Sequence, residues 1–314
     1  MYYVAHRLFA AHDRALAARL AQRVAEKTGP ENVFLPFCDT NEEDLIADVK
    51  GQRLFELDRE RLGKLTAMIA ILHGPSLDDG VCMEIGYACA LGVPVVVVTT
   101  DFQTYSMSAG GPRLEFPDPI VQAAATSVVR VARLADQQSA DAAKTRLEAF
   151  VDRNEGQLDW ALEAAVENLL DLPARRPATA SPRDGAGKVA FVEPSPYLAW
   201  QGVLTALASA AGYVLCAPGR FEAPDPVVAA HQDLNDALTA DVLIADVSGP
   251  ETPPGAALLI GAASACGTRI AAYQPRLTFT HAHGREPNWR NLMIQYASSA
   301  HLSDPAALDE WLRS

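Results

Sequence analysis

One stretch of the sequence occurs twice, and this repeat constrains the fold more than any other feature. Residues 70–98 (AILHGPSLDDGVCMEIGYACALGVPVVVV) realign without a gap with residues 245–273 (ADVSGPETPPGAALLIGAASACGTRIAAY). The shared positions are Gly74, Pro75, Gly80, Gly86 and Gly92 in the first copy and Gly249, Pro250, Gly255, Gly261 and Gly267 in the second. A long stretch that recurs at a fixed distance predicts two similar folding units in one chain.

The three acidic residues of the first copy are not kept in the second. They align with apolar residues of the second copy, since Asp78, Asp79 and Glu84 face Pro253, Pro254 and Leu259. A framework that is shared without its carboxylates predicts one half that carries the chemistry and one half that supports it.

Length and composition agree with two domains and narrow the choice of partners. At 314 residues the chain can form two cores. The net charge of −13 opposes binding to nucleic acid, which needs clustered Lys and Arg. No apolar run reaches the roughly 20 residues of a membrane span, and the opening MYYVAHRLFAAHD lacks the pattern of a secretory signal. We therefore expect a cytoplasmic protein that binds a small molecule and neither nucleic acid nor membranes.

Strand and helix patterns alternate along both halves. The first half has strand patterns at 2–5, 32–37, 66–72, 93–98 and 126–133 and helical periodicity at 10–27, 52–65, 81–91 and 137–170. The second half has strand patterns in KVAFVEP, GYVLCAP, ADVLIADV and TRIAAY and helical patterns at 199–211, 226–239 and 255–266. Such alternation predicts an α/β protein with doubly wound parallel sheets.

A linker separates the two predicted domains. Residues 172–188 (LPARRPATASPRDGAGK) are rich in Pro, Ala, Gly and Arg and have no apolar periodicity. We expect the first domain at 1–171 and the second, a shorter copy of it, at 189–314.

The turn with Asp78, Asp79 and Gly80 follows the predicted strand at 66–72. In open α/β sheets the ligand binds beyond the carboxyl ends of the strands, so this turn is expected at the binding edge. Glu84 follows in the next helix, and two carboxylates at such a place can divide nucleophilic and acid/base work. The alternative is a helix cap at Asp78 or Asp79 and a solvated Glu84. The apolar surroundings of Glu84 in MEIGYACALG favour a functional carboxylate.

The same run resembles a known family. Together with YYVAHRLF at the start and Asp58, it is similar to the nucleoside 2-deoxyribosyltransferases, whose members share a flavodoxin-like (Rossmann-like) fold and a D-x-G-x-x-x-E-x-G-Y-A signature. The signature is filled by Asp78, Gly80, Glu84, Gly86, Tyr87 and Ala88. The resemblance covers the first 100 residues well and the second copy weakly.

The resemblance implies three catalytic residues. The signature glutamate of the family attacks the anomeric carbon of a deoxyribosyl group and forms a covalent glycosyl-enzyme, which implies Glu84 as the nucleophile. Tyr3 matches a first-strand tyrosine that orients this glutamate. Asp58 matches an aspartate that serves the base. For Tyr3 a buried strand residue and for Asp58 a solvated helix residue remain alternatives.

The resemblance also implies substrate-binding residues in the first domain. Asp78 and Gly80 belong to the signature, and Phe9 belongs to the opening segment that matches the family. Asp79 matches no family role.

Family enzymes complete each site with an asparagine of a neighbouring subunit, in an N-x-M sequence that holds the 5′ end of the sugar. The first domain has no such asparagine, because its stretch 118–125 reads DPIVQAAA, whereas 291–298 in the second domain reads NLMIQYAS. Asn291 and Met293 therefore match the missing partner sequence. We expect a fused intramolecular pseudo-dimer with one complete site, possible further homo-oligomers being left open; the alternative for Asn291 is a helix cap.

The mirror-image site would combine Leu259 with Asp118 and is expected to be inactive. Asp233, which repeats Asp58, is then a remnant without a role.

The preferred interpretation is N-glycosyl transfer on deoxyribonucleosides, with a nucleoside and a nucleobase as the ligands. One alternative is hydrolysis of nucleosides or nucleoside 5′-monophosphates, and another is a regulatory protein that binds nucleosides or nucleotides without chemistry. In nucleotide-cleaving relatives a serine tends to replace Asp78, and a carboxylate there should repel a 5′-phosphate. We expect no cofactor and no metal, because His281 and His283 have no further metal ligands nearby in the sequence.

Overall fold

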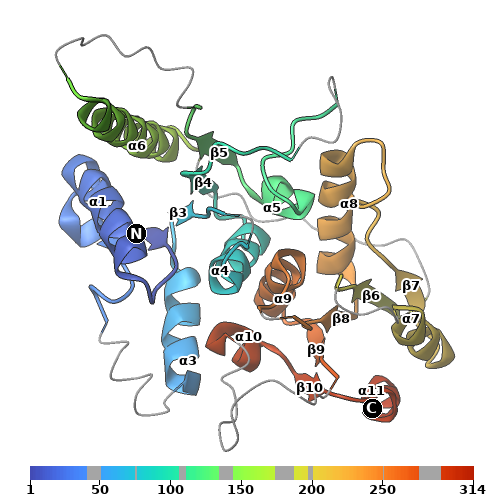
Figure 1. Cartoon of the computed structure of the whole chain (residues 1–314). Helices are drawn as coiled ribbons and strands as arrows, with labels where there is room; N and C mark the ends of the chain where they lie inside the picture. Colours follow the sequence, from blue (N-terminus) through green and yellow to red (C-terminus); the bar gives the residue numbers. More distant parts are fainter. Residues whose placement is uncertain are drawn as a thin grey trace, which may run out of the picture.

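The computed structural model of the chain describes residues 1–40, 51–74, 76–105, 111–133, 144–173, 187–196, 201–249, 251–275 and 291–314. Within these ranges the chain forms two five-stranded sheets, and every pair of neighbouring strands is parallel. The sheets lie on opposite sides of a central layer of helices (Figure 1).

The first sheet has the strand order β2-β1-β3-β4-β5. Its strands are β1 (Tyr2–Ala5), β2 (Val33–Phe34), β3 (Ala67–Ile71), β4 (Val95–Thr99) and β5 (Ser127–Arg130). The helices of this half are α1 (Ala11–Thr28), η1 (Pro30–Asn32), α3 (Gly51–Leu62), α4 (Asp79–Ala90), α5 (Pro119–Ala124) and α6 (Arg146–Leu170).

The second sheet has the order β7-β6-β8-β9-β10, which is the same order counted within its own half. Its strands are β6 (Val189–Glu193), β7 (Val214–Cys216), β8 (Val242–Asp246), β9 (Arg269–Tyr273) and β10 (Ala300–Leu302). The helices are α7 (Gln201–Ala210), α8 (Pro226–Thr239), α9 (Pro254–Cys266), α10 (Leu292–Ala297) and α11 (Pro305–Arg313). A 2-1-3-4-5 order is that of flavodoxin-like sheets, so the predicted fold class is confirmed in both halves.

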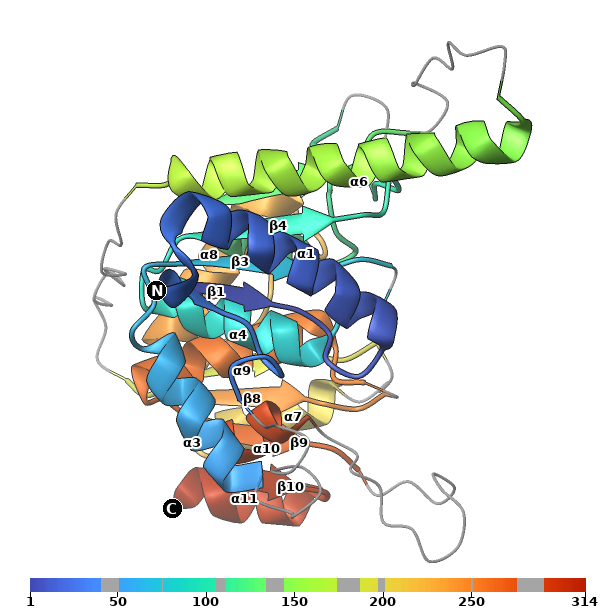
Figure 2. The same ribbon diagram turned by 90° about the vertical axis from the view of Figure 1, so that its left-hand side faces the viewer.

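Both faces of each sheet are covered, which explains the continuous apolar character of strands such as β3 and β4. The helices α1 and α6 cover the outer face of the first sheet (Figure 2), and α7 and α11 cover the outer face of the second (Figure 1). The inner faces share one core, to which both halves contribute. The two domains are therefore joined by a common hydrophobic interior.

Two glycines of the repeat allow α4 and α9 to pack backbone to backbone at the centre of the molecule (Figure 1). A Cβ added to Gly86 would collide with the carbonyl oxygen of Leu258, and one added to Gly261 would collide with that of Met83. Met83 and Leu258 are themselves equivalent positions of the repeat. The contact is thus reciprocal, as in a dimer with two-fold symmetry.

Other contacts follow the same approximate symmetry. The hydroxyl of Ser76 donates a hydrogen bond to Glu251 Oε2 at 2.8 Å, and these two residues are also repeat equivalents. The helix α5 packs against α8, as α10 packs against α3. The arrangement has the geometry of the expected intramolecular pseudo-dimer.

Most predicted elements are present, with shorter strands than the patterns indicated. The strand predicted at 32–37 is reduced to β2, and the second half contains a fifth strand, β10, that was not predicted. The short helices α5 and α10 were not predicted either, because six residues are too few for a helical period to show. The nine-residue helix α11 at the end of the second half was also missed. The predicted linker at 172–188 falls largely outside the described residues. Residues 137–143 of the helical segment predicted at 137–170 also lie outside them, and the rest of that segment contains α6.

None of the helices in the described ranges combines the length and the apolar character needed to cross a membrane.

Candidate active site

The start of α4 forms the edge of the site. Asp78 is the N-cap of this helix, and its Oδ1 accepts a hydrogen bond from the backbone N–H of Val81 at 2.9 Å. Because α4 follows β3, this cap lies beyond the carboxyl edge of the first sheet. Asp78 is therefore a helix cap and also lies at the expected binding edge, so the two interpretations of this turn are compatible.

Glu84 lies in α4 and receives a hydrogen bond from the first strand. The hydroxyl of Tyr3 donates to Glu84 Oε1 at 2.6 Å, a short distance typical of a phenol bonded to a carboxylate. Tyr3 is fully buried on the inner face of β1, whereas Glu84 is half-buried. A rigid strand residue thus fixes the orientation of a partly accessible carboxylate.

Asp58 belongs to the same neighbourhood through a series of contacts. Its Oδ1 lies 3.5 Å from Arg61 Nη1, and the guanidinium of Arg61 stands over the ring of Phe34 at 4.3 Å. The Phe34 ring in turn stacks on that of Tyr3, with centroids 5.3 Å apart. Asp58 is buried on α3, so the alternative of a solvated helix residue is wrong.

Asn291 of the second domain reaches the start of α4. A Cβ added to Gly80 would lie 2.5 Å from Asn291 Nδ2 and 3.2 Å from Asp78 Oδ1. Asn291 is also the N-cap of α10, since its Oδ1 accepts from the backbone N–H of Met293 at 2.9 Å. Its oxygen caps a helix while its amide nitrogen lies against Gly80, so the two interpretations of this residue are compatible.

Sequence reasoning missed Arg7, which follows β1. Its Nε lies 3.4 Å from Asp78 Oδ2, and its Nη2 donates to the backbone carbonyl of Ser76 at 3.4 Å. The guanidinium offsets part of the charge of Asp78. The expected repulsion between Asp78 and a 5′-phosphate is correspondingly weaker than the carboxylate alone implies.

A second group beside Asp78 was also missed. His73 Nε2 lies 3.2 Å from Asp13 Oδ1, and both residues line a small cavity that reaches Arg7 and Asp78. Burial lowers the pKa of the neighbouring His6. No sequence signal connects Asp13 with His73, because they come from different elements and meet only in the folded sheet.

Asp79 contacts the other domain. Its Oδ2 accepts a hydrogen bond from the backbone N–H of Thr252 at 3.3 Å. Burial, together with the charge of Asp78, raises the pKa of Asp79 to about 6. The residue that matched no family role therefore lies in the interface between the two domains.

The two other expected substrate-binding residues lie in contrasting surroundings. Phe9 is 73% exposed in the segment after β1, and its carbonyl accepts a hydrogen bond from Arg14 at 2.7 Å. Met293 is buried in the shared core. Their contact with a substrate stays a prediction.

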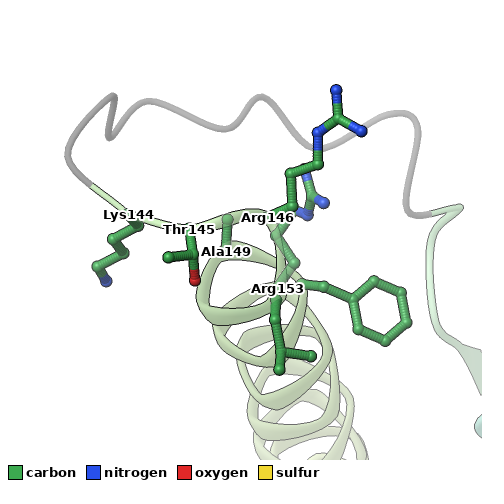
Figure 3. A pocket seen from close by; sticks show the side chains of 7 residues that line it. Lys144, Thr145, Arg146, Ala149 and Arg153 are labelled. Carbon is green, nitrogen blue, oxygen red and sulfur yellow. The ribbon is translucent and has the colours of Figure 1, made fainter.

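A further hollow lies on α6, away from these residues. It is lined by Lys144, Thr145, Arg146, Leu147, Ala149, Phe150 and Arg153, all from one short stretch of chain (Figure 3). It contains none of the expected site residues, and the start of α6 projects beyond the sheet (Figure 2). This hollow is therefore separate from the candidate site at the start of α4.

Comparison with known protein families gives one match. The sequence model described as nucleoside 2-deoxyribosyltransferase matches residues 2–159, which include β1, α3, α4 and their carboxylates. No curated protein matches the chain.

Proposed function

The chain belongs to the nucleoside 2-deoxyribosyltransferase family, and from this premise we propose that it transfers deoxyribosyl groups between nucleobases through a covalent intermediate on Glu84. The observation that carries the proposal is the 2.6 Å hydrogen bond from Tyr3 to Glu84 Oε1 at the carboxyl edge of the first sheet. A nucleophilic carboxylate must be held in one orientation, and this bond supplies that constraint.

In the first step, a carboxylate oxygen of Glu84 attacks C1′ of the nucleoside. The C1′–O bond forms while the C1′–N bond breaks, and the electron pair of the broken bond leaves with the base. Asp58 hydrogen-bonds the base and delivers the proton that the leaving nitrogen needs. Burial of Asp58 on α3 and its contact with Arg61, which stands over the Phe34 ring that stacks on Tyr3, support a position beside the base.

In the second step, a nitrogen of an incoming base attacks C1′ and displaces Glu84 as a carboxylate. The proton of the incoming base passes to Asp58, so the enzyme returns to its first state. Two inversions at C1′ give overall retention, as in retaining glycosidases.

The sugar is held from both domains. Asp78 and Gly80 contribute the start of α4, and Asn291 contributes an amide from α10. The approach of Asn291 Nδ2 to the Gly80 position supports a composite site for the 5′ end of the sugar.

Hydrolysis of a nucleoside 5′-monophosphate is the second candidate, and one observation favours it. Arg7 pairs with Asp78 at 3.4 Å and is about one-third exposed, so a cation is available near the sugar end of the site. A deoxynucleoside 5′-monophosphate therefore belongs in every activity test.

The test follows both bases by chromatography after incubation of the full-length protein with a deoxynucleoside, with and without a different free base. Exchange that requires the acceptor base supports the transferase. Base release that does not require it, from the nucleoside or from its 5′-monophosphate, supports the hydrolase. Absence of turnover with a panel of both substrate types would leave a binding protein.

Glu84→Gln is the diagnostic variant. Its matched control is Glu60→Gln, because Glu60 is an exposed glutamate of α3 that pairs with Lys64 just after the helix. Intact-protein mass spectrometry of the wild type with a slow nucleoside analogue should show a glycosyl adduct that Glu84→Gln lacks. Full activity of Glu84→Gln would refute the covalent mechanism.

A further inference from the structure

The strand registers identify what replaces the reactive pair in the second half. Tyr3 pairs with Met68 between β1 and β3, and Phe191 pairs with Leu243 between β6 and β8. Met68 and Leu243 are repeat equivalents, so Phe191 occupies the position of Tyr3. Because Leu259 occupies the position of Glu84, both partners of the hydrogen bond are replaced by apolar side chains.

A buried cation lies where this second half would bind a substrate. Arg220 is 1% exposed, and its guanidinium makes paired contacts with two carboxylates. Nε and Nη2 donate to Asp118 at 2.7 and 3.0 Å, and Nη2 and Nη1 donate to Glu193 at 2.5 and 3.2 Å. Nη1 also donates to Asp233 Oδ2 at 3.2 Å. Three carboxylates therefore surround one guanidinium.

Two of these carboxylates correspond to the expected ends of the substrate site in the first half. Asp118 is the equivalent of Asn291, and like it caps a short helix, because its Oδ1 accepts from Ile120 N at 3.0 Å. Asp233 is the equivalent of Asp58, and its ion pair with Arg220 shows that the expectation of a residue without a role is wrong. The guanidinium of Arg220 contacts both carboxylates. In the second half it therefore occupies the place that corresponds to the expected sugar and base positions of the first half.

The glycines at the helix starts locate this cation in the same way. A Cβ added to Gly255, the equivalent of Gly80, would lie 2.5 Å from Arg220 Nη2. The same Cβ would approach Asp118 Oδ2 even more closely, as one added to Gly80 would approach Asn291 Nδ2, so Asp118 takes the place of Asn291 and Arg220 lies beside it. We call the space between Asp118, Asp233 and Gly255, which the Arg220 guanidinium fills, the second crevice.

The cluster also joins the two domains. Asp118 comes from the first domain, whereas Arg220, Glu193 and Asp233 come from the second. Burial raises the pKa of Glu193 to about 7, although Arg220 opposes this shift. Removing the guanidinium would leave buried carboxylates without a counter-charge, which is strongly unfavourable.

We infer that Arg220 is a built-in occupant of the second crevice, taking the place of a substrate, and that the filled crevice holds the domains so that Asn291 reaches Gly80. The comparison of the two crevices rests on the proposed function of the first. It follows that each chain binds one nucleoside. Arg220 is then a positioning residue for the first site, although it touches no substrate.

Occupancy is tested without any need for activity. Arg220→Gly should lower the melting temperature by several degrees, and millimolar guanidinium chloride should restore part of the loss while the same concentration of sodium chloride does not. Wild-type protein should show no such gain. Equal effects of the two salts on Arg220→Gly would overturn the idea of a guanidinium-shaped crevice.

Stoichiometry tests the same claim through the ligand. Calorimetric titration of the wild type with a deoxynucleoside should give one site per chain, and two sites would contradict an occupied second crevice. If no nucleoside binds at all, the proposed function fails while the guanidinium result still decides on the occupancy.

Positioning is tested by kinetics. Arg220→Ala should raise KM for the nucleoside about tenfold with a smaller change in kcat, and combination with Asn291→Asp should add little further, since both act through the same contact. Arg130→Ala is the matched control, because Arg130 is buried and paired with Glu115 inside the first domain. It should lower stability without raising KM.

Asp118→Asn provides the same readout if Arg220→Ala does not fold, because it weakens the paired contact and keeps the shape of the side chain. A loss of stability in either variant with an unchanged KM would show that the cluster is structural only.

Discussion

Replacing Tyr3 with phenylalanine isolates the hydrogen bond on which the proposed mechanism depends. The substitution removes one hydroxyl from a fully buried ring and keeps the stacking on Phe34 at 5.3 Å. A hydrogen bond to a charged group contributes about 1.5–3 kcal/mol. At about 1.4 kcal/mol per factor of ten, loss of the bond should reduce kcat/KM about 10- to 150-fold.

The assay is single-turnover base exchange with saturating and with limiting deoxynucleoside. Because the bond orients the attacking carboxylate, we expect the loss mainly in kcat. Tyr2→Phe is the matched control: it removes a hydroxyl from the preceding residue of β1, whose side chain packs on the outer face of the sheet. Tyr2→Phe should keep wild-type rates.

The reasoning is refuted if Tyr3→Phe turns over within about twofold of the wild type while folding normally, because the smallest expected effect is about tenfold. A rise in KM alone would also contradict it, since it would indicate a contact with the substrate rather than orientation of Glu84.

Three further predictions concern the interface and the composite site. Asn291→Asp keeps a side chain that can cap α10 but replaces the amide next to Gly80, so KM for the nucleoside should rise while the melting temperature changes little; a normal KM would exclude Asn291 from the site. Gly86→Ala should destabilise the protein by about 2 kcal/mol or more, because its Cβ meets backbone in α9. The matched Gly156→Ala in α6, with nothing within 4 Å, should stabilise it by about 1 kcal/mol; similar denaturation midpoints for the two variants would argue against the close helix contact. The pKa of Asp79 is raised from 3.8 to about 6, so the folded protein binds this proton more tightly than the unfolded chain and loses stability as pH rises through this window. Asp79→Asn should therefore be more stable than the wild type above about pH 7, by at most about 3 kcal/mol, and nearly equal to it at about pH 4 in thermal unfolding experiments.

The fold could be predicted well from the sequence because its signals are local. Continuous apolar strands and periodic helices such as α1 and α8 are long enough to show their period. The strand β10 and the helices α5 and α10 are short, and tertiary packing decides their structure. The repeat predicts the two-domain architecture independently of any single helix or strand.

The residues of the candidate site also differ in how local their sequence signals are. Glu84, Asp78 and Gly80 lie in one contiguous motif, and Tyr3 and Asn291 could be found because a family resemblance connected distant segments. Arg220 could not be found, because nothing in CAPGRFEAPDP indicates that its guanidinium meets carboxylates from three other elements.

The repeated glycines are a further signal in the sequence. Glycines kept at equivalent positions of a repeat, within two apolar helices, predict a close contact between those helices. Gly86 and Gly261 are such a pair, and their positions in the sequence alone indicate the contact between α4 and α9.

The reciprocal contact of α4 and α9 has a consequence for how such a protein can diverge. In a homodimer one coding sequence specifies both sides of the symmetry axis, so every substitution arises twice and loss of the carboxylate destroys both centres. Here each side has its own stretch of coding sequence. A substitution such as leucine at position 259, which repeats position 84, changes one side alone. One half can therefore lose its carboxylate while the other half keeps Glu84.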